Sequence, residues 1–206
     1  MNEALKLSQA LSAKICHDFA GSIGTIDTCL SLLEGTNESI STQARKLVYS
    51  ESKNFIKRIK FFRSTYSLSE DDKDVSLAST LKCLEEFFET ENVEFTSHVG
   101  PVDNNIQDQI AKAIYCLVSI VAEQITIKGT IDLHVSDNND LIRIISNNHN
   151  LNLKEESFAI LNGNDSIPIT VLNCREHYIL NLCAVSGYKV IVQKNDNSYE
   201  YLIMKK

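Results

Sequence analysis

The sequence is poor in proline, and its first third has none. The two prolines are Pro101 and Pro168, so no proline interrupts a helix within residues 1–68. Apolar residues recur there every three or four positions, which is typical of amphipathic helices. We therefore predict helices over residues 3–34 and 39–67, joined by a short turn that makes them antiparallel. Asn37 or Ser39 is expected to cap the second helix.

The chain also lacks an excess of cations and a long apolar run. Acidic residues outnumber basic ones by 27 to 20, and the net charge of -7 disfavours binding to nucleic acid or to an anionic membrane. The longest apolar stretch, residues 114–122, falls short of the roughly 18 residues that a membrane span needs. Charged residues stand near the N-terminus, where a signal peptide has its apolar region, so we expect a cytoplasmic protein.

Cysteine pairs with the spacing of a metal or redox site are missing. The six cysteines form no C-x-x-C pair, and without an export signal we expect them to be reduced thiols. Cys174 and His177 have a metal-ligand spacing, but no second pair accompanies them. We therefore expect no bound metal.

The apolar stripes of the two long helices are wider than one hairpin can bury. Homodimerisation into a four-helix bundle is the economical solution. After a polar linker at residues 69–74, shorter helical and strand patterns alternate. The helices are expected at 75–89, 106–127 and 167–186, and the strands at 93–99, 130–135, 141–146, 188–193 and 199–204. The predicted fold class is α+β, with a helical hairpin domain at 1–68 and an α/β domain at 75–206.

His17 occupies the face of the first helix that is opposite its apolar stripe. The other residues on this face are small, namely Ala13, Ala20, Gly21 and Gly24. Each glycine inside a helix costs about 1 kcal/mol relative to alanine. Two such glycines beside an exposed imidazole indicate a surface that a second protein approaches closely.

Lysines gather near this histidine. Lys14 lies one turn before it, and Lys53, Lys57 and Lys60 lie on the second helix, where we expect His17 to be level with about residue 55. An exposed imidazole among ammonium groups suits the acceptance of a phosphoryl group, because the cations offset its charge. The alternative is that these side chains are only solvated surface groups.

The segment around this histidine resembles a known family. Residues 14–26, KICHDFAGSIGTI, are similar to the helix of the ChpT-type histidine phosphotransferases, in which RLCHDL is followed by GPVGAI. Residues 30–33 (LSLL) match the family's LELL, and residues 58–63 (RIKFFR) are similar to its Arg-Leu-x-Phe-x-Arg. The chain departs from this pattern with Lys14 in place of arginine and Ser22 in place of proline.

This resemblance implies a homodimer with a four-helix bundle, and a second domain similar to a histidine-kinase ATP-binding domain that has lost its nucleotide. It implies that His17 accepts a phosphoryl group from the receiver-domain aspartate of a hybrid kinase. The group then passes to receiver domains of response regulators, including a cell-cycle transcription factor. Mg2+ is expected in the receiver, and this chain is expected to bind no cofactor. Asp18 orients the imidazole, acts as a base, or is a surface charge paired with Lys14.

Two other functions stay open. A non-catalytic dimeric docking module would bind receivers without accepting phosphate. A histidine kinase would need an asparagine-rich helix and glycine-rich boxes around Mg-ATP. The helix expected near residues 111–127 has no asparagine, residues 146–151 read SNNHNL, and Gly163 and Gly187 stand alone, so ATP-dependent autokinase activity is not expected.

Overall fold

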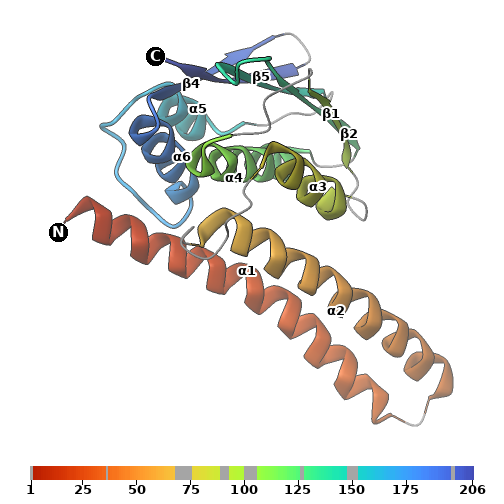
Figure 1. Ribbon diagram of the computed structural model, residues 1–206. Helices are drawn as coiled ribbons and strands as arrows, with labels where there is room; N and C mark the ends of the chain where they lie inside the picture. Colours follow the sequence, from red (N-terminus) through yellow and green to blue (C-terminus); the bar gives the residue numbers. More distant parts are fainter. Residues whose placement is uncertain are drawn as a thin grey trace.

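Two long antiparallel helices form an arm at the N-terminal end of the chain (Figure 1). The computed structural model describes residues 2–35, 37–67, 76–88, 93–99, 106–125, 128–147, 153–195 and 198–206. Helix α1 spans Glu3–Leu33 and helix α2 spans Glu38–Tyr66. The side chain of Asn37 caps α2 by accepting hydrogen bonds from the backbone N–H groups of Ser39 and Ile40. The predicted hairpin is confirmed, and its helix ends agree to within a residue.

The rest of the chain forms a sheet with helices on one face. The helices are α3 (Leu77–Phe88), α4 (Asp108–Gln124), α5 (Glu155–Leu161) and α6 (Cys174–Val185). The strands are β1 (Val93–Val99), β2 (Gly129–Val135), β3 (Leu141–Asn147), β4 (Tyr188–Lys194) and β5 (Ser198–Lys205). Their order in the sheet is β1-β2-β3-β5-β4, in which β1 and β2 are parallel and the other neighbours antiparallel. The α+β class is confirmed.

The helical layer lies between the sheet and the arm, as Figure 1 shows. Helix α4 is at its centre and buries eleven of its residues, in keeping with the long apolar run from which it was predicted. Alternate residues of the strands fill the inner face of the sheet, with Ile131, Leu133, Ile144 and Tyr201 fully buried. The helical layer therefore forms a packed base on which the arm is mounted.

The expected helix over residues 167–186 is wrong in its first part. Helix α6 begins only at Cys174, because Asn173 holds the preceding residues in a turn. Its side chain accepts a hydrogen bond from the N–H of Thr170 at 2.7 Å and donates to the carbonyl of Pro168 at 3.1 Å. Helix α5 was not predicted, since its seven residues are too few to show a helical period.

Helix α2 of the arm is fixed to the base by aromatic packing and by a hydrogen bond. Phe61 of α2 is 3% exposed, stacks on Phe87 at a centroid distance of 4.4 Å and meets Tyr115 edge-on at 5.5 Å. The hydroxyl of Tyr178 donates a hydrogen bond to the carbonyl of Thr65 at 3.1 Å. These contacts hold the arm at a defined angle to the α/β base. The expected linker at 69–74, and with it the domain boundary, lies outside the described residues.

Much of the free part of the arm is apolar and exposed. Ile23 and Leu30 of α1 and Ile40, Leu47 and Ile56 of α2 all present their side chains to solvent in the single chain. The hairpin of a second protomer would cover these side chains in a four-helix bundle. The bundle stays a prediction, because the structure describes a single chain. None of the helices in the described ranges has the length and apolar content needed to cross a membrane.

Candidate functional site

His17 lies where the arm leaves the base, and its side chain is 84% exposed. Ala13, Ala20, Gly21 and Gly24 are exposed on the same helix, as the helical spacing indicates. A Cβ atom added at Gly21 or Gly24 would meet no atom within 4 Å. The packing of this chain therefore gives no reason for glycine at these positions.

Asp18 contacts the side chains of both Lys14 and His17 on α1. Its Oδ1 accepts a hydrogen bond from Lys14 Nζ at 2.8 Å and lies 3.4 Å from His17 Nδ1. Because a carboxylate attracts a proton to the nearer ring nitrogen, it favours the tautomer with hydrogen on Nδ1. The lone pair of His17 Nε2 is then available to an electrophile. The pairing with Lys14 was one of the roles considered for Asp18.

The α2 lysines proposed from the sequence, Lys53, Lys57 and Lys60, differ in their height along the arm relative to His17. Phe19 packs against Phe55 at 5.4 Å and Phe62 at 5.1 Å, which places His17 level with about residue 60 rather than residue 55. Lys57 and Lys60 are thus near its height, whereas Lys53 is about two turns away and covers the ring of Tyr49.

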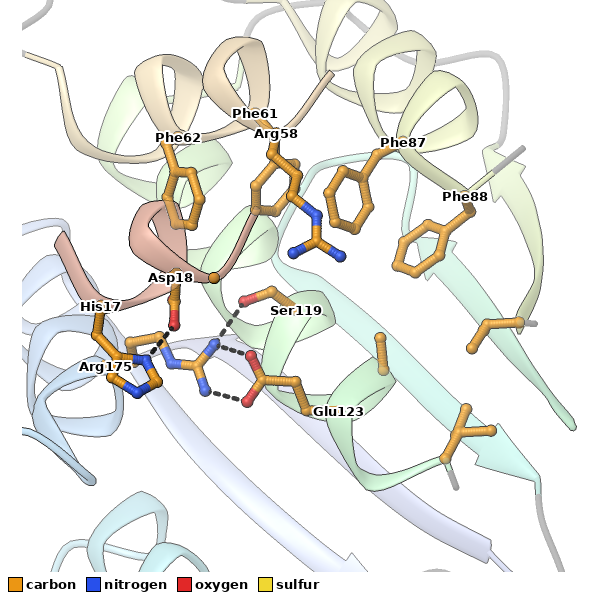
Figure 2. Close-up of a pocket in the computed structure, with 14 residues that line it drawn as sticks. His17, Asp18, Arg58, Phe61, Phe62, Phe87, Phe88, Ser119, Glu123 and Arg175 are labelled. Carbon is orange, nitrogen blue, oxygen red and sulfur yellow. Dashed lines mark hydrogen bonds and ion pairs between the residues drawn. The ribbon is translucent and has the colours of Figure 1, made fainter. Parts of the chain in front are cut away.

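A cavity of about 450 Å³ opens beside His17 between the arm and the base (Figure 2). Asp18 and Gly21 border it on α1, and Arg58 borders it on α2. Its remaining wall is largely apolar and includes the aromatic rings of Phe61, Phe62, Phe87 and Phe88. The three lysines of α2 proposed from the sequence do not line this cavity, so Arg58 is the cation that α2 contributes to it.

An ion pair from the base forms the opposite wall. Arg175 on α6 binds Glu123 on α4 through two hydrogen bonds of 2.7 and 2.5 Å and lies 3.5 Å from the hydroxyl of Ser119. Burial lowers the pKa of Arg175, but the hydrogen bonds and charge of Glu123 outweigh it, so the pKa is raised and the guanidinium stays charged. This pair was not predicted, because its members are 52 residues apart on separate helices.

A second cavity, of about 300 Å³, shares three residues with the first, namely His17, Glu123 and Arg175. Lys14 and Lys154 also line it. The imidazole of His17 therefore lines two cavities, and Arg175 borders both of them.

The described residues cover only part of the regions in which a metal or a nucleotide site was considered. In the parts of the chain that the structure describes, no group of three or more His, Cys, Asp or Glu side chains is placed to hold a metal ion. Cys174 is buried against Leu7 and Ala10 of α1, where it is a packing residue. Helix α4 has no asparagine to hold Mg-ATP, and residues 148–152, where a glycine-rich box was sought, lie outside the described residues. No step of the chemistry below involves ATP.

Comparison with other proteins identifies the fold. No protein-family model matches the chain, and no curated protein is similar to it in sequence. Among solved structures, a bacterial phosphotransferase superposes with a TM-score of 0.85 at 21% identity, over 98% of each chain. Full-length ShkA in complex with AMPPNP gives a TM-score of 0.50 at 11% identity, over 100% of this chain and 47% of that one. The whole fold, arm and base together, therefore occurs in a protein described as a phosphotransferase.

Proposed function

We propose that this chain is a histidine phosphotransferase of a phosphorelay. His17 accepts a phosphoryl group from the receiver-domain aspartate of a hybrid kinase and delivers it to receiver domains of response regulators. The observation that carries the proposal is the exposed imidazole whose Nδ1 lies beside Asp18, on a helix face lined by small residues. The likeness in fold to a bacterial phosphotransferase supports it.

The transfer needs no net movement of a proton. The lone pair of His17 Nε2 forms a bond to phosphorus, while the bond from phosphorus to the aspartyl oxygen breaks and leaves its electron pair on the receiver's carboxylate. His17 Nδ1 keeps its hydrogen, which faces Asp18. Asp18 is thus a positioning residue that also stabilises the positive charge of the phosphorylated ring. Delivery to the next receiver is the same step in reverse.

The small residues give the receiver access to the imidazole. Because Ala13, Ala20, Gly21 and Gly24 project little from α1, an incoming backbone can approach closely enough for in-line attack. The acidic pocket of a receiver, which brings its own Mg2+, is complementary in charge to the exposed cations Lys53 and Lys60 and to the half-buried Lys57. Two protomers would join through the apolar face of the arm to complete a four-helix bundle.

A transfer assay tests this function. The chain is mixed with a receiver domain phosphorylated on aspartate, and acid-labile, base-stable label is measured on the native chain, on His17→Ala and on His98→Ala. We expect label on the native chain and on His98→Ala, which changes an exposed histidine of the sheet, and none on His17→Ala. Binding of receivers without label on any chain would refute the proposal and favour a docking module. Label from ATP alone would refute it in favour of a kinase.

A further inference from the structure

Arg175 belongs to the base, yet it is held next to the arm. It follows Cys174, the first residue of α6, which is 1% exposed and packs against Leu7, Ala10 and Leu11 of α1. This contact fixes the start of α6 on α1 about two turns before His17. Figure 2 shows the guanidinium on the side of α1 that carries His17 and Asp18.

Two ion pairs lie next to His17 before any phosphoryl group arrives. Lys14 is paired with Asp18, and Arg175 is paired with Glu123. A phosphoryl group on the imidazole adds about two negative charges in the space that His17 and Arg175 both line. If one of these pairs opens, its cation can help to neutralise the new charge, together with Arg58 and Lys154, which line the same space.

The pair formed by Arg175 is the one suited to opening. Glu123 is 55% exposed, so water can solvate its carboxylate once the arginine has left. Arg175 is only 11% exposed and keeps its charge, so it needs an anionic partner at all times. Its planar guanidinium binds phosphate oxygens through two parallel hydrogen bonds, as it binds Glu123 now.

We infer that Arg175 exchanges Glu123 for the phosphoryl group on His17, so that the α/β base binds the phosphorylated form of the site. The inference rests on the proposed transfer to His17. It gives the base a role in the relay, because Arg175 raises the fraction of the chain that carries phosphate and slows its loss.

Two substitutions with opposite effects test the exchange. Arg175→Gln removes the guanidinium, whereas Glu123→Gln removes its competitor for the arginine. With a phosphorylated receiver as donor, we expect Arg175→Gln to lower the equilibrium ratio of phosphorylated to free chain by about 10-fold, as for the loss of one charge-assisted hydrogen bond. Glu123→Gln should raise this ratio and lengthen the half-life of the isolated phosphorylated chain. Both variants should still take up label on His17. Absence of label on every chain would refute the proposed function, whereas label with unchanged ratios would refute only the exchange by Arg175.

A spectroscopic measurement separates binding of phosphate from a purely structural role. The phosphorus NMR signal of the phosphorylated chain is followed as a function of pH, because a nearby guanidinium lowers the pH at which the phosphoryl dianion takes up a proton. We expect this midpoint to rise in Arg175→Gln and to return toward the native value in Arg175→Lys, which restores a positive charge. An unchanged midpoint and an unchanged equilibrium ratio in Arg175→Gln would overturn the inference. A loss of phosphate in both Arg175→Gln and Glu123→Gln would also overturn it, because the pair would then act only in folding.

Discussion

Ala13, Ala20, Gly21 and Gly24 form the small-residue face of α1, and substitution of Gly24 tests whether this face serves receiver docking or folding. A Cβ atom at this position meets nothing within 4 Å, so larger side chains fit the folded chain. Because glycine inside a helix is less favourable than alanine or leucine by about 1 kcal/mol, Gly24→Ala and Gly24→Leu should both stabilise the protein by roughly that amount. For a chain of this length, the midpoint of thermal unfolding should rise by about 2–4 °C.

The two variants should differ in phosphotransfer. Alanine adds one carbon to the face beside His17, whereas leucine adds four. A side chain that overfills a packed interface costs about 1–3 kcal/mol, which corresponds to roughly 5- to 150-fold weaker receiver binding. We expect this loss in Gly24→Leu and a much smaller one in Gly24→Ala, measured as the rate of label uptake at receiver concentrations below saturation.

The stability and the transfer rate of Gly24→Leu together decide whether receivers dock beside this residue. A Gly24→Leu protein that is stabilised and yet transfers at the native rate would show that receivers do not dock on this face. Gly24→Ala is the matched control, since it shares the gain in helix propensity without the bulk. Light scattering should give the same oligomeric mass for both, because Gly24 is not among the exposed apolar residues through which the arms are expected to pair.

Three further predictions concern the lysines, the junction and pH. Lys57→Glu combined with Lys60→Glu should weaken receiver binding at low salt and much less at high salt, because both positions lie near the height of His17 and the effect is electrostatic. Phe61→Ala should lower the free energy of unfolding by about 3–5 kcal/mol in urea titrations, since this buried ring joins α2 to α3 and α4, whereas Phe61→Leu should lower it much less. Burial lowers the pKa of His177, so the unfolded chain binds a proton more readily than the folded chain, and stability should fall as pH drops below the ordinary value of 6.5. His177→Gln should reduce this dependence in denaturant titrations compared between pH 7.5 and 5.5.

Each of these predictions has an outcome that contradicts it. Binding of the double lysine variant that is equally weak at low and high salt would show that the lysines act through structure. A Phe61→Ala protein as stable as the native chain would mean that the junction does not depend on this ring. If His177→Gln keeps the full loss of stability in acid, the partly buried imidazole is not the source of that loss.

The hairpin and the strands could be predicted because their signals are local. Apolar positions with helical spacing define α1 and α2, and the turn residues Asn138, Asn139 and Asp140 mark the hairpin between β2 and β3. The start of α6 could not be predicted in the same way. It depends on hydrogen bonds between Asn173 and backbone groups three and five residues earlier, which compete with the helix.

Only those features of the candidate site that depend on a single helix could be predicted from the sequence. The position of His17 opposite the apolar stripe follows from helical geometry, and the structure leaves its side chain exposed. The register between α1 and α2 is set by the contacts of Phe19 with Phe55 and Phe62, which chain length alone does not give. The pairing of Arg175 with Glu123 depends on how α4 and α6 pack, and no spacing in the sequence encodes it.

Delivery of phosphate from the phosphorylated chain tests the relay most directly. The chain is labelled by one phosphorylated receiver, separated from it, and then mixed with a second receiver that carries no phosphate. The account predicts that label leaves His17 and appears on the aspartate of the second receiver, and that a second receiver without this aspartate takes up none. Label that stays on the chain, or that is released only as inorganic phosphate, would contradict the proposed relay.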